Sequence, residues 1–363
     1  MFYSLIYKFF GADYSFLNVF KYVTFRSICA FLTSFFFVLL IGSKFIHFLK
    51  CHQKNGQPIR DDGPQSHIEK KKGTPTMGGL MIISSVIFGG LLFGDLSNIN
   101  LWLCLIVFIG FGLIGAIDDY RKVSKNDYHG ISGKKKFLLQ SLVAMVCCYI
   151  SLKFYNFEGS TSVFLPIFKN FQIDLGWFFM IWAAFITVGS SNAVNLTDGL
   201  DGLAMGPVIT SSICLAIIAY LAGNTVFSDY LHIQYVPEMA EVCVFLSSLV
   251  GASLGFMWFN APPAKVFMGD TGSVAIGGAL GFISVMSKHE FIFAIIGGIF
   301  VIETVSVIIQ VLYFRATGKR IFLMAPIHHH FEKKGWAEST VVFRFWIISM
   351  VLGILGLALL KVR

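Results

Sequence analysis

Long runs of apolar residues, separated by short polar stretches, follow one another along the whole chain. A helix that crosses a bilayer needs about 20 predominantly apolar residues, and about ten runs have roughly this length. The runs are continuous, whereas the strands of a membrane barrel give short alternating segments. We therefore predict an all-α polytopic membrane protein with about ten transmembrane helices. Their approximate bounds are 23–45, 75–94, 98–117, 136–153, 174–191, 203–222, 239–257, 271–287, 291–313 and 339–360.

The composition agrees with this pattern. Hydrophobic residues make up 56% of the 363 residues and charged residues only 13%, whereas soluble domains carry about 25% charged residues. No polar stretch is long enough to fold by itself, so we predict a single integral membrane domain over residues 1–363. The first long apolar run begins near Val23 and no small-residue cleavage site follows it, so no cleavable signal peptide is expected.

The net charge of +8 is distributed unevenly across the predicted membrane. Eighteen Lys and Arg residues fall in one alternating set of loops and seven on the other side. The positive-inside rule places the first set in the cytoplasm, and an even number of spans then places both termini outside. This distribution explains the charge without a nucleic-acid partner. The first set is Lys50, Lys54, Arg60, Lys70, Lys71, Lys72, Arg121, Lys122, Lys125, Lys134, Lys135, Lys136, Lys265, Arg315, Lys319, Arg320, Lys333 and Lys334.

The seven cysteines form no CxxC pair, and most lie within apolar runs. A thiol in such a run behaves as a small apolar side chain. We expect neither disulfides nor a cysteine metal site.

Polar clusters interrupt the apolar pattern only on the predicted cytoplasmic side. This concentration predicts an enzyme that takes a soluble substrate from the cytoplasm and a second substrate from the lipid. A secondary transporter, the alternative, holds its ionisable residues near the bilayer midplane. Glu303, in the middle of the ninth span, is the one feature that favours a transporter, and Gln310 on the same helical face extends its polar surface. The clusters are 70–76, 118–119, 191–202, 260 with 267–273, and 326–332.

The aspartates suggest metal and phosphate chemistry. Asp270 stands among Gly269, Thr271 and Gly272, where it suits Mg²⁺, which favours one or two carboxylates plus substrate phosphates. The alternative is that Asp270 caps the helix that begins near Thr271. Asp118 and Asp119 point about 100° apart on a helix, so one can address a metal or a proton while the other holds a loop. Alternatively, the pair only marks the end of a span.

Three further groups suit substrate recognition. Asn195, Asp198 and Asp201 are spaced by three, and they lie on one face if the stretch opens the sixth span. Three consecutive histidines cannot all bind one metal from a regular helix, so we expect phosphate or nucleobase contacts there, or simply a solvated loop. The lysines before Gly73 and those at 134–136 suit anionic substrates or lipid headgroups, although topology alone explains most of them. The histidines are His328, His329 and His330.

Together these segments resemble the phospho-N-acetylmuramoyl-pentapeptide-transferase family, within the polyprenyl-phosphate N-acetylhexosamine-1-phosphate transferase superfamily. They follow the family order through nearly the whole chain. The paired aspartates and the Asn-Asp loop resemble the whole superfamily, whereas the Pro-Ile-His-His-His-Phe-Glu stretch resembles the muramoyl-pentapeptide branch. The matching segments are Gly73–Gly79, Asp118–Tyr120, Asn192–Leu203, Phe267–Ser273 and Met324–Glu332.

The resemblance implies transfer of phospho-N-acetylmuramoyl-pentapeptide from its UDP-linked precursor to undecaprenyl phosphate, giving lipid I and UMP. It also implies Mg²⁺, a ten-helix fold with periplasmic termini in the bacterial inner membrane, and commonly a homodimer. Asp270 would be the metal ligand, and Asp118 and Asp119 would complete the catalytic set. UDP-N-acetylglucosamine is the alternative donor, and direct attack by the lipid phosphate and a covalent aspartyl intermediate both remain open. The implied substrate-binding residues are Lys71, Thr76, Asn195, Asp198, Asp201, Asn260, Gln310 and His329.

Overall fold

The computed structural model describes residues 2–3, 15–53, 56, 73–125, 130–155, 157–166 and 171–361. In this part of the chain, nine helices are long and apolar enough to cross a membrane. The prediction of an all-α polytopic membrane protein is confirmed. The second predicted span, 75–94, differs, because its apolar helix α4 (Gly79–Phe93) has only 15 residues.

The helices of the first half follow the predicted order, and several extend beyond the predicted spans. A short antiparallel hairpin that the sequence did not suggest lies between α6 and η3, with Val163 opposite Ile173. The elements are η2 (Ser15–Lys21), α2 (Val23–His52), α4, α5 (Ile99–Lys125), α6 (Gly133–Phe154), β1 (Ser162–Phe164), β2 (Gln172–Asp174), η3 (Gly176–Phe178) and α7 (Phe179–Thr197).

The second half contains the most deeply buried helix and the helices around it. The elements are α8 (Met205–Ala222), α9 (Thr225–Leu231), η4 (Met239–Glu241), α10 (Val242–Asn260), α11 (Gly269–Met286), α12 (Glu290–Ile296), α13 (Gly298–Thr317), α14 (Ile327–Lys333) and α15 (Glu338–Ala358).

Helix α11 lies at the centre of the bundle. Of its most apolar 18-residue window, 94% is buried, and it packs against α5 and α7. Small residues make this close packing possible, because they let helix backbones approach one another within a membrane. A Cβ at Gly277 or Gly281 would collide with α7, and a Cβ at Gly278 would collide with Phe111 of α5.

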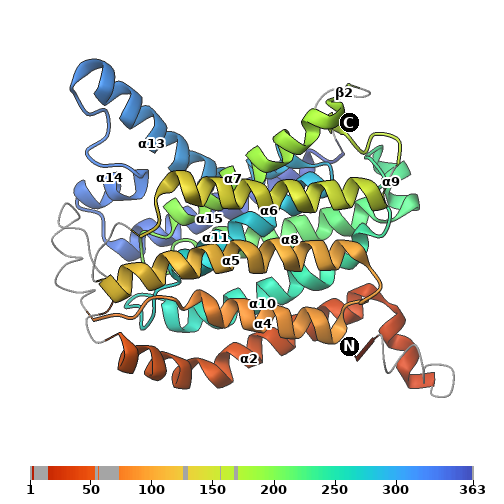
Figure 1. The fold of residues 1–363 in the computed structure, drawn as a ribbon, viewed down its shortest axis with the longest axis horizontal. Helices are drawn as coiled ribbons and strands as arrows, with labels where there is room; N and C mark the ends of the chain where they lie inside the picture. Colours follow the sequence, from red (N-terminus) through yellow and green to blue (C-terminus); the bar gives the residue numbers. More distant parts are fainter. Residues whose placement is uncertain are drawn as a thin grey trace.

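The predicted span 291–313 is broken into two helices at Gly297. Helix α12 ends at Ile296 and α13 begins at Gly298, so this predicted span is wrong in its first third. Two adjacent glycines have low helix propensity, which explains the break at this point. Helix α13 leaves the bundle at an angle, with α14 beside it (Figure 1). Only 22% of the α13 window is buried.

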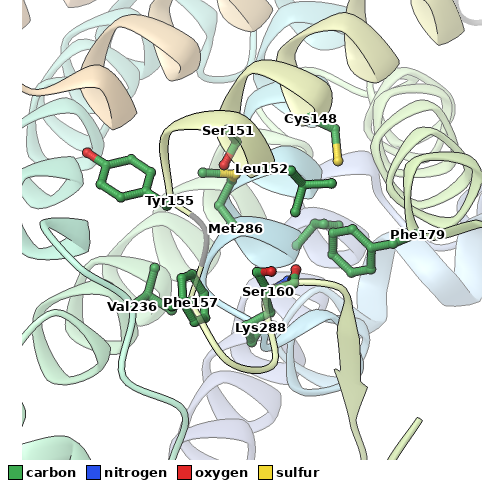
Figure 2. Close-up of a pocket in the computed structure, with 11 residues that line it drawn as sticks. Cys148, Ser151, Leu152, Tyr155, Phe157, Ser160, Phe179, Val236, Met286 and Lys288 are labelled. Atoms are coloured by element: carbon green, nitrogen blue, oxygen red, sulfur yellow. Dashed lines mark hydrogen bonds between the residues drawn. The ribbon is translucent and has the colours of Figure 1, made fainter. Parts of the chain in front are cut away.

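Both marked ends of the chain lie at one end of the bundle, and α14 lies at the other (Figure 1). Near the chain ends, a cavity of about 20 Å³ is lined by Lys288 and mostly apolar side chains, which is room for about one water molecule. Figure 2 shows Ser160 next to Lys288, with Tyr155 and Phe179 on opposite sides. The Lys288 ammonium donates to the Ser160 carbonyl and lies 3.8 Å from the centre of the Phe179 ring.

Candidate active site

Asp118 and Asp119 lie near the end of α5, where both are almost fully buried, with exposures of 3% and 2%. Their side chains have different partners. Different partners are what the expectation of separate roles requires, and the burial of both side chains does not agree with an acidic pair that lies in water at the end of a span. The separate roles themselves stay a prediction.

Asp119 caps the first turn of α11. Its Oδ1 accepts a hydrogen bond from the backbone nitrogen of Asp270 at 3.1 Å. Its Oδ2 accepts from the backbone nitrogen and the hydroxyl of Thr271, at 2.8 and 2.7 Å. The first N–H groups of a helix have no partner within the helix, so a carboxylate from another helix satisfies them. The alternative that Asp270 caps this helix is wrong, because Asp119 does so.

Asp118 and Asp270 face the same two lysines. Lys122 Nζ lies 2.7 Å from Asp118 Oδ2 and 3.1 Å from Asp270 Oδ2. Lys136 Nζ lies 2.7 Å from Asp270 Oδ2 and 3.9 Å from Asp118 Oδ2. Asp118 also accepts from the backbone nitrogen of Ile131, at 2.5 Å. The result is a compact group of two carboxylates and two ammonium groups from α5, α6 and α11.

Two glycines allow α11 to reach this position. A Cβ at Gly115 of α5 would overlap the backbone of Asp270, and a Cβ at Gly79 of α4 would overlap the backbone of Gly272. The first turn of α11 is thus enclosed by two other helices, and the Asp270 backbone is fixed.

Thr76 lies against the same turn. The segment before α4 pairs with the segment before α11, since the nitrogen of Phe267 donates to the carbonyl of Pro75 at 2.9 Å. Gln53, at the C-cap of α2, holds the Thr76 backbone through two hydrogen bonds, of 2.9 and 3.2 Å. The Thr76 hydroxyl is buried and has no hydrogen-bond partner among the described residues.

The stretch 191–202 closes α7 and does not open the sixth span, so that part of the prediction is wrong. Helix α7 ends at Thr197, with Asp198 at its C-cap, and α8 begins only at Met205. Asn195 still points to the site, because its Oδ1 accepts from the Ser273 hydroxyl of α11 at 2.7 Å.

Asp201 and Asn260 tie two loops together. Asp201 Oδ2 accepts from the nitrogen of Ala264 at 2.9 Å. Asn260 accepts from the nitrogen of Gly202 at 3.0 Å and donates to the carbonyl of Val266 at 2.9 Å. Both ends of the Asn260 amide are thus bound within the protein, and its side chain shapes the loops around the site.

The three histidines of α14 have three different environments. His328 is fully buried against Glu303 of α13. His329 Nδ1 lies 2.6 Å from Glu332 Oε2. His330 Nδ1 accepts a hydrogen bond from the backbone nitrogen of Leu323 at 3.1 Å, so Nδ1 itself carries no proton. Burial and the nearby charge of Lys334 lower the pKa of His330, in agreement with a neutral ring. A neutral imidazole is better suited to a hydrogen bond with a nucleobase than to binding a diphosphate.

Gln310 binds the loop between α13 and α14. Its side-chain oxygen accepts from the nitrogens of Ile321 and Phe322, and its amide donates to the Phe322 carbonyl. It therefore positions the segment that carries the histidines. Lys71, also expected at the site, lies outside the described residues.

The carboxylates suit a Mg²⁺ ion held partly by substrate. In the described part of the chain, no three His, Cys, Asp or Glu side chains are arranged to hold a metal ion. Asp118 and Asp270 present oxygens to the same place, whereas both oxygens of Asp119 are taken by α11. Two carboxylates plus substrate phosphates match the coordination that Mg²⁺ favours. The donor set fits the ion, and Asp118 and Asp270 are the side chains that could hold it.

Sequence reasoning did not single out Lys122 and Lys136 as site residues. The lysines at 134–136 were candidates for anionic substrates or lipid headgroups as a group, without a distinction for Lys136, and Lys122 counted only toward topology. One signal was present: Lys122 follows Asp118 by four positions on one helix, so the two side chains meet.

Comparison with known proteins agrees with this geometry. The profile of glycosyl transferase family 4 matches residues 101–288, and a phospho-N-acetylmuramoyl-pentapeptide-transferase signature matches residues 71–83, which include Thr76. The phospho-N-acetylmuramoyl-pentapeptide-transferase of Pelagibacter ubique is 58% identical over all 363 residues and is covered completely. The chain belongs to the phospho-N-acetylmuramoyl-pentapeptide-transferase family. The Rickettsia felis protein of the same name is 54% identical over 347 residues, covering 95% of this chain and 96% of that protein.

Membership in the phospho-N-acetylmuramoyl-pentapeptide-transferase family gives the polar clusters a common context. The glycosyl transferase match spans α5 through α11, the helices that carry both acidic groups and Lys136. The muramoyl signature covers the segment that pairs with residues 267–268 just before α11. Both matches therefore converge on the first turn of α11, and a secondary transporter is excluded as the family of this chain.

Proposed function

We propose that this protein transfers phospho-N-acetylmuramoyl-pentapeptide from UDP to undecaprenyl phosphate, with Mg²⁺, at the cytoplasmic face of the bacterial inner membrane. The products are lipid I and UMP. A lipid phosphate oxygen forms a bond to the sugar-linked phosphorus, and the bond between that phosphorus and the UMP oxygen breaks. The group of Asp118, Asp270, Lys122 and Lys136 carries this proposal, because a reaction between phosphates depends mainly on positioning and charge neutralisation.

Each residue of the group has a defined task. Mg²⁺ bound to Asp118 and Asp270 would supply a positive charge that stabilises the phosphate oxygens. Lys122 and Lys136 would turn from the carboxylates to the phosphates of the two substrates and offset their mutual repulsion. Asp119 keeps the Asp270 backbone in place and is unsuited to act as a base while three donors occupy its oxygens.

The other side of the site would take the nucleotide and sugar. Thr76 offers an unpaired hydroxyl, and Asn195 points at the first turns of α11. His329 and His330 on α14 would contact the nucleobase or the diphosphate. We place the histidines on the cytoplasmic side on the strength of the lysine and arginine distribution.

The direct test is release of UMP from the purified protein. UMP should form from UDP-N-acetylmuramoyl-pentapeptide only when Mg²⁺ and undecaprenyl phosphate are both present. UMP release without the lipid would instead favour a covalent aspartyl intermediate. Turnover of UDP-N-acetylglucosamine in preference to the muramoyl nucleotide would contradict the proposed donor.

A further inference from the structure

Glu303 and His328 form a contact that the proposed reaction does not use. Both side chains are fully buried, and His328 Nδ1 lies 3.0 Å from Glu303 Oε1. Neither the carboxylate nor the imidazole forms a regular hydrogen bond with any described residue, so each is the other's polar partner. Ionisable residues within membrane helices pair with one another and have a function. The remainder of α13 is mostly apolar and exposed, which makes this buried carboxylate conspicuous.

The opposite side of the His328 ring contacts a different element. Its Nε2 faces Gly199, in the loop that follows Asp198, and a Cβ at Gly199 would overlap the ring. His328 therefore fills the space between α13 and the loop of Asp198 and Asp201. An imidazole in this place has no room to turn toward a substrate.

Helix α14 depends on few contacts for its position. It has seven residues and no side-chain hydrogen bond at its N-cap. Besides His328, it is held by Phe331, which packs on Phe345 of α15 and stacks on Trp336, and by the bond from Leu323 to His330. Because His329 and His330 follow His328 directly, a shift at His328 moves both of them.

We propose that Glu303 and His328 are a positioning pair, which locks α14 to α13 and sets the spacing between His329 and the Asp198 loop. The inference rests on the proposed function, since it assumes that these two elements hold the donor nucleotide. It assigns His328 a role distinct from that of its two neighbours. Glu303 acts through His328 and touches no substrate.

The test is a comparison of kinetic constants in the full-length protein. Glu303→Ala should raise the KM for UDP-N-acetylmuramoyl-pentapeptide by about tenfold, because it removes the polar partner of the buried His328 ring. The KM for undecaprenyl phosphate should change by less than about twofold, because that substrate makes no use of the spacing. Glu303→Gln keeps an acceptor oxygen for Nδ1 and should restore most of the affinity. Thr304→Val is the matched control, since Thr304 bonds only to the Phe300 carbonyl of its own helix.

A second pair of variants covers the case in which Glu303→Ala does not fold. His328→Asn places an amide nitrogen near the position of Nδ1 and should keep a nearly normal KM, whereas His328→Ala should raise it. In Glu303→Ala/His328→Ala, the KM should match that of the single variants, because a pair is lost only once. If Glu303→Ala and His328→Ala both keep the wild-type nucleotide KM, the pair does not position the site. If the wild-type protein releases no UMP, the proposed function itself fails.

Discussion

The carboxylate of Asp119 accepts two hydrogen bonds from Thr271, one from its backbone nitrogen and one from its hydroxyl. With the third bond, from the nitrogen of Asp270, these contacts fix the turn that carries the proposed metal ligand. Within the acidic pair of α5, Asp119 thus holds the first turn of α11, and Asp118 is the residue that we propose for the reaction.

Asp119→Asn should destabilise the protein more than Asp118→Asn does. The amide offers one acceptor oxygen to three donors and turns an NH₂ group toward them, which costs about 1–3 kcal/mol. Asp118→Asn should lose more activity than stability. Thermal unfolding in detergent, measured beside UMP release, separates the two effects. Equal unfolding temperatures for both variants would mean that Asp119 does not hold α11.

Asp270→Asn should fold normally and lose nearly all activity, because it removes a charge and almost no volume. We expect less than about one tenth of wild-type turnover at saturating Mg²⁺. The measurement is UMP release across a Mg²⁺ titration. A variant with higher turnover would show that Asp270 is not the principal metal ligand.

Lys136→Met should lower kcat by about tenfold or more, because Lys136 is one of the two cations next to Asp118 and Asp270. Lys135→Met is the control, since Lys135 precedes Lys136 on the same helix and its side chain is exposed. Initial rates at saturating concentrations of both substrates give the comparison. If the two variants have the same kcat, the lysines at 134–136 serve topology alone.

The stability of the protein should rise with pH above about pH 8 because of Lys288. Burial lowers the pKa of Lys288 to about 8 from its usual 10.5. Between these values the unfolded chain binds more protons than the native protein, so unfolding becomes less favourable as pH rises. Below pH 8 both states are protonated, and the full cost of burying the charge remains.

Lys288→Met tests this pH dependence. The difference in unfolding temperature between wild type and Lys288→Met should move in favour of wild type from pH 8 to pH 10. Lys361→Met is the control, because Lys361 also lies over an aromatic ring, 3.7 Å from the centre of Tyr230, but is exposed. A difference that stays constant over this range would contradict the lowered pKa.

The orientation of the site can be tested with single cysteines in a background without the seven native ones. A cysteine at Lys333, exposed at the end of α14, should react with a membrane-impermeant thiol reagent only after the inner membrane is opened. A cysteine at Thr225, exposed at the other end of the bundle, should react in cells with a permeable outer membrane. Labelling of the Lys333 site from outside would place the histidines away from the nucleotide supply.

Local patterns in the sequence were enough to predict most of the membrane-spanning helices. The length of the apolar runs located the spans, and the distribution of Lys and Arg in the loops predicted that the polar clusters share one side of the membrane. The break at Gly297 was missed because a window of apolar residues does not register two small residues within it. The length of α4 was overestimated, since the predicted span began at Pro75, whereas the segment 75–78 pairs with residues 267–268 and the helix begins only at Gly79.

Contacts between segments that are far apart along the chain could not be predicted from the sequence. Asp118 and Asp119 are chemically identical, and only the arrival of α11 distinguishes them. Likewise, the sequence placed Glu303 inside a span and His328 in a loop, but the contact between them depends on how α14 folds back. Lys136 is one of three consecutive lysines, and only the direction of each side chain on α6 decides which of them contacts Asp270.

The close approach of α11 to its neighbours has a consequence for inhibition. A single methyl group added at Gly79 or Gly115 would overlap the backbone of the turn that carries Asp270. A compound that binds by contact with this turn would meet a target with few tolerated substitutions at these two positions. Escape from such a compound would have to come from residues farther from the turn, where side chains can change without moving the backbone.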